Sequence, residues 1–380
     1  MNLAQGKTKT AREPLFHIVK RTDIPFWKAW LIRIAAVVAA LVLCGIIILL
    51  LTGKNPFEMY KIMFEGSFKT ERKFWKMLQD LAMLLCVALA VTPAFKMRFW
   101  NIGAEGQVLI GGLGAAICMK LLGDDGAKLS NELLLPITIL TAVVFGAIWG
   151  VIPAIFKANW NTNETLFTLM MNYIAIQIIA YFTFIWSSGS NTVGKINADS
   201  HAGWLQLPAS VDKYGYLLNI IIVAVLTILM FLYLKYSKQG YEISVVGESI
   251  NTARYIGINV KKTVIRTMLI SGALCGVAGL LLVSGTDQSI TAETAGGRGY
   301  TAIMVSWLAK FNPFYMILTA FIVVFLQRGA DELQTQTQRI INVDFADVLI
   351  AIIIFFIIGC EFFINYSIKF RHRKSKEVTA

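Results

Sequence analysis

Charged residues are scarce in this chain. Asp, Glu, Lys and Arg make up 15% of its 380 residues and hydrophobic residues make up 56%, whereas a soluble domain carries about a quarter charged residues. This balance excludes an ordinary soluble domain. Several apolar runs reach the roughly 20 residues that a helix needs to cross a bilayer, and the short alternating segments of a membrane β-barrel do not recur. The composition predicts an all-α polytopic membrane protein.

Catalytic and nucleotide-binding signatures are also missing. The motifs HExxH, GxSxG and GxxxxGK[ST] do not occur, and the GKT at 6–8 lacks the upstream glycine and the strand that a nucleotide loop requires. The five cysteines form no CxxC pair and the three histidines lie far apart. We therefore expect a chain that is not itself an enzyme, binds no cofactor and takes its energy from a separate subunit.

Basic residues concentrate at the two ends, which explains the formal net charge of +12 better than nucleic-acid binding does. They cluster in 1–29, before or at the start of the first span, and in 367–380, after the last one. Basic flanks mark the cytoplasmic side of a bacterial inner membrane. We expect cytoplasmic segments at 1–29 and 367–380, a transmembrane permease domain over 30–366, and both termini in the cytoplasm.

The apolar runs divide into about ten spans. Their approximate ranges are 30–52, 74–95, 102–122, 133–156, 164–186, 217–236, 263–285, 301–309, 314–327 and 345–366. The run at 301–309 is short for a span, and leaving it out gives nine spans and places the C-terminus outside. Ten spans form two sets of five, and an odd number per set inverts the second half relative to the first.

A pair of glycine-rich stretches agrees with inverted halves. WNIGAEGQ at 100–107 follows the second span and is expected at the inner face. ETAGGRGY at 293–300 follows the seventh span and is expected at the outer face. Inversion predicts such opposite placement.

A polar loop at 237–262 separates the two halves and is rich in basic residues, which places it in the cytoplasm. Its core predicts one short amphipathic helix that Ser249 caps and Gly257 ends in a left-handed turn. The apolar stripe of this helix consists of Ile250, Ala253 and Ile256. Docking to a cytoplasmic partner and resting on lipid headgroups both fit this pattern.

Polar side chains inside apolar segments are candidates for a translocation path. Asn101, Glu105 and Gln107 adjoin glycines at the mouth of the third span, where they either line a broken helix or stabilise close packing. Asn172 and Gln177 lie within the fifth span, and both interhelical hydrogen bonds and pore lining fit them.

Two further candidates lie outside the apolar segments. Arg298, between two glycines, either meets an anionic group or anchors a turn. Trp100 belongs to an aromatic belt or stacks on substrate, for which Phe167 and Tyr173 are further candidates.

Three motifs in order resemble the branched family of bacterial ABC-importer permeases: NIGAEGQVLIGG (101–112), VGESINTARYIGIN (246–259) and GGRGYTAIMVSWL (296–308). The chain is most similar to the nucleoside and simple-sugar members that work with a basic-membrane-protein-type lipoprotein. The likeness runs from about residue 55 onward and implies a type II ABC-importer fold.

The resemblance also implies site residues. In that family, the loop matching 247–259 contains the coupling helix that seats in a cleft of the ATPase. The matching positions here are Gly247, Glu248, Asn251, Ala253, Arg254 and Gly257. Family members often have Asn-Pro where this chain has Ser249-Ile250, so the helix start depends on the serine cap.

The resemblance implies ATP-driven nucleoside uptake by alternating access, with purine nucleosides favoured. The expected partners are an ABC ATPase with two nucleotide-binding domains that holds ATP and magnesium, a second homologous permease or a copy of this chain, and an extracytoplasmic substrate-binding lipoprotein. Uptake of ribose or another simple sugar is the alternative. An ion-coupled secondary transporter is a further one, and it would need intramembrane acidic residues such as Glu105 and Glu361.

Overall fold

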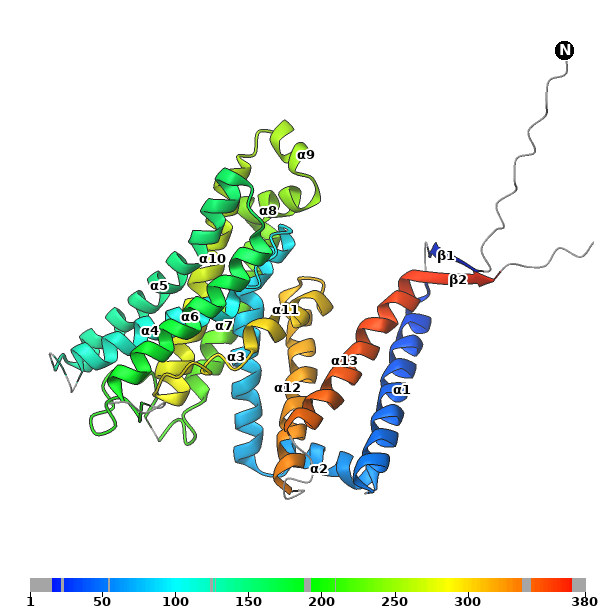
Figure 1. The fold of residues 1–380 in the computed structure, drawn as a ribbon, viewed down its shortest axis with the longest axis horizontal. Coiled ribbons are helices and arrows are strands. Elements are labelled where there is room, and N and C mark those ends of the chain that lie inside the picture. The colour runs from blue at the N-terminus through cyan, green and yellow to red at the C-terminus, as the bar shows by residue number, and fades with distance from the viewer. Residues whose placement is uncertain are drawn as a thin grey trace, which may run out of the picture. The chain divides into compact units, whose positions relative to one another are not determined.

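The computed structural model describes residues 16–21, 24–53, 55–123, 126, 128–187, 193–208, 210–336 and 343–370. The described chain is almost entirely helical (Figure 1). Its elements are β1 (Phe16–Lys20), α1 (Phe26–Thr52), α2 (Pro56–Phe68), α3 (Glu71–Lys96), α4 (Ala104–Leu122), α5 (Asn131–Trp160), α6 (Glu164–Trp186), α7 (Leu217–Tyr236), α8 (Lys238–Glu248), α9 (Ile250–Tyr255), α10 (Val260–Leu280), the π-helical segment η1 (Leu281–Asp287), α11 (Arg298–Leu308), α12 (Pro313–Gln336), α13 (Val343–Asn365) and β2 (Tyr366–Phe370).

Within its described residues, the chain forms two compact units, and the first comes from 1–62 and 330–380. In it α1 packs along α13, and a buried α1 seam of Ala40, Cys44 and Ile48 recurs at every fourth residue, one helical face. An ion pair of 2.8 Å joins Arg33 to Glu361. Strands β1 and β2 pair antiparallel at the end of these helices.

The strand pair adds two elements that were not predicted. Residues 16–20 and 366–370 are strands, where only basic tails at 1–29 and 367–380 were predicted. Helix α1 also begins at Phe26 rather than near residue 30, directly after Pro25, whose backbone is extended (φ −56°, ψ 137°). Two strands pair here because α1 and α13 bring both ends of the unit together. Residues 1–15, 22–23 and 371–380 of the predicted tails lie outside the described residues.

The second unit, 63–329, is built around α10. This helix packs on α3, α4 and α5. Glycines make the approach close: a Cβ at Gly150 would lie 2.9 Å from the Cα of Gly272, and one at Gly146 would lie 2.7 Å from the Cα of Gly276. Small residues at this spacing let two backbones touch. Glycine at these positions therefore serves the close packing of α5 against α10.

Nine helices in the described part of the chain are long and apolar enough to cross a membrane. They correspond to nine of the ten predicted spans and make this a multi-pass membrane protein. The predicted short span at 301–309 is α11, a helix of 11 residues, about 16 Å long at ~1.5 Å per residue. That is about half of the ~30 Å hydrocarbon core. The division into two inverted halves stays a prediction.

Candidate functional site

A carboxylate from α4 holds the N-terminus of α11. Glu105 lies in the first turn of α4 and is 6% exposed. Its two oxygens accept hydrogen bonds from the backbone N–H groups of Gly297 and Gly299, each at 2.7 Å. A carboxylate at a helix N-terminus satisfies donors that have no partner within the helix and complements the helix dipole. Glu105 therefore fixes the point where the half-length helix begins.

The chain enters α11 through two left-handed residues, Gly296 (φ +57°) and Gly297 (φ +71°). Residues with a Cβ rarely adopt this conformation, so glycine suits both positions. A Cβ at Gly299 would lie 2.7 Å from a carboxylate oxygen of Glu105. The glycines of this stretch thus permit the turn and the close approach of α11 to α4.

An acidic residue on α3 holds the same helix start from another direction. Asp80 is 7% exposed and forms ion pairs with Lys76 at 3.5 Å, with Arg298 at 3.7 Å and with Arg328. Removing one partner of a buried ion cluster leaves an uncompensated charge, which is strongly destabilising. The first turn of α11 is therefore tied to α3 through Arg298 and to α4 through Glu105.

Two buried amides brace the turn between α3 and α4. Asn101 and Gln107 exchange hydrogen bonds of 3.2 and 3.3 Å between their side chains, and both are almost fully buried. The oxygen of Asn101 also accepts from the N–H of Gly103 at 3.1 Å. These contacts give the turn a fixed shape, as buried polar groups require partners.

A third buried amide, Asn172, connects α6 to this turn and to α11. Its oxygen accepts from the N–H of Gly106 at 2.9 Å. Its nitrogen donates to the carbonyl of Ile102 at 2.9 Å and to the hydroxyl of Tyr300 at 3.1 Å. Asn172 thus forms the interhelical hydrogen bonds that one of the two interpretations expected.

The predicted path residues divide into a set around the start of α11, buried except for the half-buried Arg298, and an exposed set. Asn101, Glu105, Gln107, Asn172 and Arg298 come together around the start of α11. Gln177 lies apart, on the exposed face of α6. Trp100 is 44% exposed and its ring lies 5.3 Å from that of Trp307. Contact of any of these residues with substrate stays a prediction.

The expected placement of the two glycine-rich stretches at opposite faces is wrong. Glu105, from 100–107, forms hydrogen bonds with Gly297 and Gly299, from 293–300. The sequence pattern misled because residues after η1 turn back into the protein before α11 begins. The two stretches lie at one depth and form one site.

The loop at 237–262 contains two helices, where one was predicted. Helix α8 extends from Lys238 to Glu248, and Ser237 caps it by accepting from the N–H of Gly240 at 2.9 Å. Helix α9 follows, and Ser249 accepts from the N–H of Thr252 at 3.2 Å. The predicted serine cap is confirmed, and so is the left-handed Gly257, with φ +84°. Helix α8 was missed because its sequence is largely polar and contains two glycines.

The apolar stripe predicted for α9 divides between one buried and two exposed residues, and its contact with a partner or with lipid stays a prediction. Ala253 is fully buried, but Ile250 and Ile256 are each 49% exposed. Tyr255, which the sequence analysis did not select, is 90% exposed. Ala253 alone faces inward because a six-residue helix presents little more than one turn to its support.

The predicted coupling residues likewise fall into two sets. Glu248, Asn251, Arg254 and Gly257 are exposed. Gly247 and Ala253 are buried and support the loop from beneath; a Cβ at Gly247 would lie 3.2 Å from the Cα of Met97. Contact of these residues with an ATPase stays a prediction.

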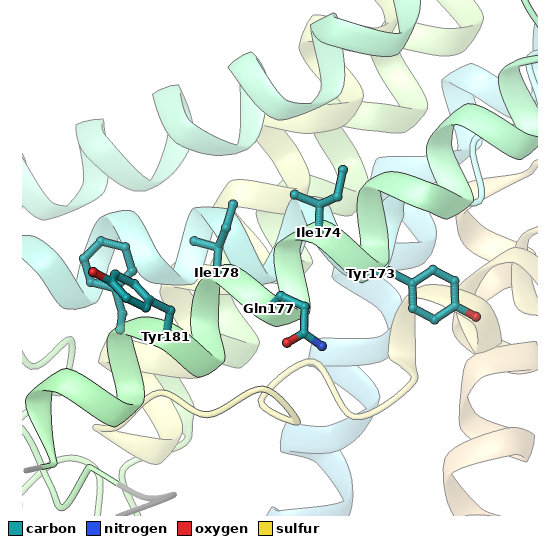
Figure 2. Close-up of a pocket in the computed structure, with 6 residues that line it drawn as sticks. Tyr173, Ile174, Gln177, Ile178 and Tyr181 are labelled. Atoms are coloured by element: carbon teal, nitrogen blue, oxygen red, sulfur yellow. The ribbon is translucent and has the colours of Figure 1, made fainter. Parts of the chain in front are cut away.

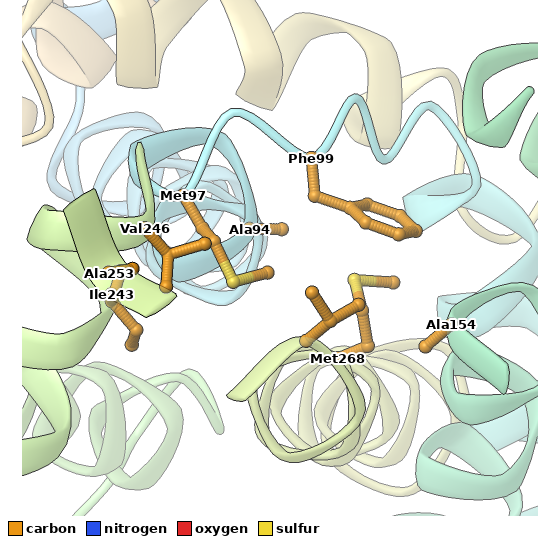
Figure 3. Close-up of a cluster of buried hydrophobic side chains, with 9 residues drawn as sticks. Ala94, Met97, Phe99, Ala154, Ile243, Val246, Ala253 and Met268 are labelled. Carbon is orange, nitrogen blue, oxygen red and sulfur yellow. The ribbon is translucent and has the colours of Figure 1, made fainter. Parts of the chain in front are cut away.

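A hydrophobic cluster joins the loop to the helices below it (Figure 3). Its members come from the end of α3 and the turn after it, from α5, from α8 and α9, and from α10. They are Ala94, Met97, Phe99, Ala154, Ile243, Val246, Ala253, Val264 and Met268. An ion pair of 2.8 Å between Glu242 and Arg266 fastens α8 to α10. Helix α9 is thus packed, through this cluster, against the turn that leads into Asn101.

Asp80 is the functional candidate that the sequence analysis missed. It interrupts an apolar span, within the run KMLQDLAML. An ionisable residue inside a membrane span is by default a candidate for a functional site. Its neighbour Gln79 donates to the hydroxyl of Thr286 at 2.6 Å.

Glu361, which was considered for ion coupling, is instead paired with Arg33. Among the described residues, no group of three or more His, Cys, Asp or Glu could hold a metal ion.

Comparison with known proteins supplies a family. A model described as branched-chain amino acid transport system / permease component matches residues 75–358. The chain is 29% identical to the guanosine ABC transporter permease protein NupP of Bacillus subtilis, over 91% of this chain and 97% of the relative.

Two further relatives match most of their own length. The nucleoside ABC transporter permease protein NupB of Lactococcus lactis is 29% identical over 83% of this chain and 87% of the relative. A glucose ABC transporter permease protein of Haloferax volcanii is 26% identical over 92% of each.

Proposed function

The chain belongs to the family of branched-chain amino acid transport system permease components, and from this premise we propose that it is the transmembrane subunit of an ATP-driven importer of nucleosides. The observation that carries the substrate class is the likeness to a guanosine and a nucleoside permease over more than four fifths of this chain. Purine nucleosides are favoured because the first of these relatives is named for guanosine.

Energy enters through α9 in this proposal. The helix is capped at both ends, presents Tyr255 and Arg254 outward, and rests on the buried cluster through Ala253. Seated in a cleft of an ABC ATPase, α9 would transmit ATP-driven closure to the turn at Met97–Phe99 and from there to Glu105 and α11. The buried contacts between α9 and the turn at Met97–Phe99 favour a coupling role for α9 over binding of the helix to lipid headgroups.

The remaining parts of the importer are separate proteins in this proposal. ATP and magnesium bind to an ATPase with two nucleotide-binding domains. A second homologous permease, or a copy of this chain, offers the second docking site, and an extracytoplasmic lipoprotein delivers the substrate. The assembly lies in a bacterial inner membrane with both termini in the cytoplasm, so that the basic loop at 237–262 meets the ATPase.

Uptake by the reconstituted complex tests the proposal. Vesicles that enclose ATP, with the lipoprotein outside, should accumulate radiolabelled guanosine. Unlabelled inosine should compete, and ribose, glucose and leucine should not. Accumulation of glucose but not guanosine would instead establish sugar uptake, which the Haloferax relative favours as the second candidate.

A further inference from the structure

The exposed face of α7 is aliphatic along most of its length and ends in a lysine. Its exposed positions recur every three or four residues, which is one side of a helix: they are Ile221, Ala224, Val225, Ile228, Leu229, Leu232, Lys235 and Tyr236. The aliphatic part, 221–232, is about 16 Å long at ~1.5 Å per residue. This is about half of the ~30 Å hydrocarbon core, the depth that the acyl chains of one leaflet fill.

Aromatic rings hold the ammonium group of Lys235. Its nitrogen lies 5.2 Å from the centroid of the Phe231 ring and 5.4 Å from that of Tyr236. A cation within about 6 Å of a ring centroid is attracted by the face of the ring. The ring of Phe231 in turn packs against that of Phe314, at the start of α12, with their centroids 4.7 Å apart. Two helices therefore build the aromatic platform that carries Lys235.

Exposed aromatic residues place this platform at the level of the lipid headgroups. Tyr236 is 69% exposed, Phe314 is 48% exposed and Tyr315 is 64% exposed. Amphipathic rings such as tyrosine collect at the boundary between membrane and water. Helix α7 also ends here and leads into the basic loop at 237–262. Lys235 therefore lies beside the headgroups, and the aliphatic face of α7 lies beside the acyl chains.

The charge of this patch is positive. The sequence contains no Asp or Glu in 221–238 or in 301–318, and both Lys235 and Lys238 are exposed. In the described part of the chain, Lys235 forms no ion pair. Glu242, the next acidic residue along the chain, is already paired with Arg266 at 2.8 Å. Lys235 thus presents a positive charge that no acidic side chain among the described residues neutralises.

The exposed face of α6 shows that aromatic rings alone do not make such a patch. An open pocket of about 490 Å³ lies along that helix (Figure 2). The residues that line it are Tyr173, Ile174, Gln177, Ile178, Tyr181 and Phe182. None of them is charged, so the face of α6 has no group that could pair with a charged headgroup. The end of α7 combines a lysine, aromatic rings and a long aliphatic face.

An anionic phospholipid matches all three features in one molecule. Its phosphate pairs with the ammonium group of Lys235, and its acyl chains cover the aliphatic face of α7. Basic sites between membrane-spanning helices are known to bind anionic headgroups in this way. A free phosphate would leave the aliphatic face unused, and the headgroup of a zwitterionic lipid carries a positive group that Lys235 repels.

We propose that the end of α7 binds one anionic phospholipid, with its headgroup at Lys235 between Phe231 and Phe314 and its acyl chains along 221–232. Because Phe314 belongs to α12, the bound headgroup also lies against the start of that helix. The site is separate from α9 and from the start of α11, and it does not depend on which substrate is transported.

Native mass spectrometry of the purified full chain tests the site. The chain in detergent is titrated with dioctanoyl phosphatidylglycerol, with dioctanoyl phosphatidylcholine and with inorganic phosphate. One phosphatidylglycerol should bind, and phosphatidylcholine should bind about fivefold more weakly, the factor that one lysine contributes near anionic lipid. Equal binding of the two lipids would overturn the recognition of charge. Displacement of the lipid by phosphate would reassign the patch to a free anion and overturn the lipid site.

Two substitutions of Lys235 and a matched control locate the site. Lys235→Gln should weaken phosphatidylglycerol binding about fivefold, and Lys235→Arg should keep the parent affinity. Lys262→Gln is the control, because Lys262 is also exposed and basic but lies outside the aromatic patch, and it should bind like the parent. An equal loss in Lys262→Gln and Lys235→Gln would reveal diffuse attraction to the net charge and overturn the site. All three positions are on the surface, so the lipid-free variants should melt with the parent.

The complete importer distinguishes lipid from protein at this face. The complex is assembled in vesicles of phosphatidylcholine and phosphatidylglycerol and then purified, and the lipid that remains bound is identified by mass spectrometry. The parent complex should retain phosphatidylglycerol and the Lys235→Gln complex should lose it. A parent complex that retains none, when the isolated chain binds one, would assign the face to a protein partner and overturn the site.

Discussion

Replacing Glu105 should loosen the start of α11 in proportion to the hydrogen bonds removed. Its two oxygens accept two backbone N–H groups, both at 2.7 Å, in an almost dry site. A hydrogen bond to a charged group contributes about 1.5–3 kcal/mol. Glu105→Ala removes both bonds and should lower the free energy of unfolding by about 3–6 kcal/mol. Glu105→Gln keeps one acceptor oxygen and should lose about half as much.

Thermal unfolding of the purified chain, followed by tryptophan fluorescence, measures the effect. The melting temperatures should fall in the order parent, Gln variant, Ala variant. Glu248→Ala is the control, because Glu248 is exposed at the end of α8 and surface changes usually stay within about 0.5 kcal/mol. An Ala variant that melts with the parent, or a Gln variant that melts below the Ala variant, would refute the clamp.

Three further changes test other parts of the fold. Asp80→Asn removes the anion shared by Arg298 and Arg328 and should lower the free energy of unfolding by about 3–5 kcal/mol, as breaking a buried pair does; an unchanged melting temperature would contradict the ion cluster. Gly276→Leu inserts a side chain where two backbones touch and should abolish a single folded peak in size-exclusion chromatography, so a normal peak would argue against the packing. Arg254→Glu, on the exposed side of α9, should keep the melting temperature but allow ATP hydrolysis without uptake in the complex, and intact uptake would remove α9 from the coupling role.

Helix content was predictable because the apolar runs are long. Nine predicted spans appear as helices, and α6 and α7 match their predicted bounds. The start of α6 is set locally, because the side chain of Asn163 accepts a hydrogen bond from the N–H of Leu166. Capping chemistry also fixed α9, where Ser249 and Gly257 act locally. These features depend on neighbouring residues only, which a single sequence displays.

Contacts between distant segments were not predictable in the same way. Glu105 meets Gly297 and Gly299 across more than 190 residues, and the chain must turn back after η1 for them to meet. Helix α8 contributes only two buried apolar side chains, Ile243 and Val246, to the core. Its sequence therefore shows little apolar periodicity. Asp80 and its neighbour Lys76 were visible in the sequence, yet the partners Arg298 on α11 and Arg328 on α12 appear only in the fold.

The dependence of uptake on ATP tests the central claim most directly. Vesicles that contain the complete importer, treated with ionophores that collapse proton and sodium gradients, should accumulate guanosine while ATP is enclosed and stop when the ATPase is omitted. Accumulation of guanosine by this chain alone, driven by an imposed proton or sodium gradient, would contradict an importer powered through α9.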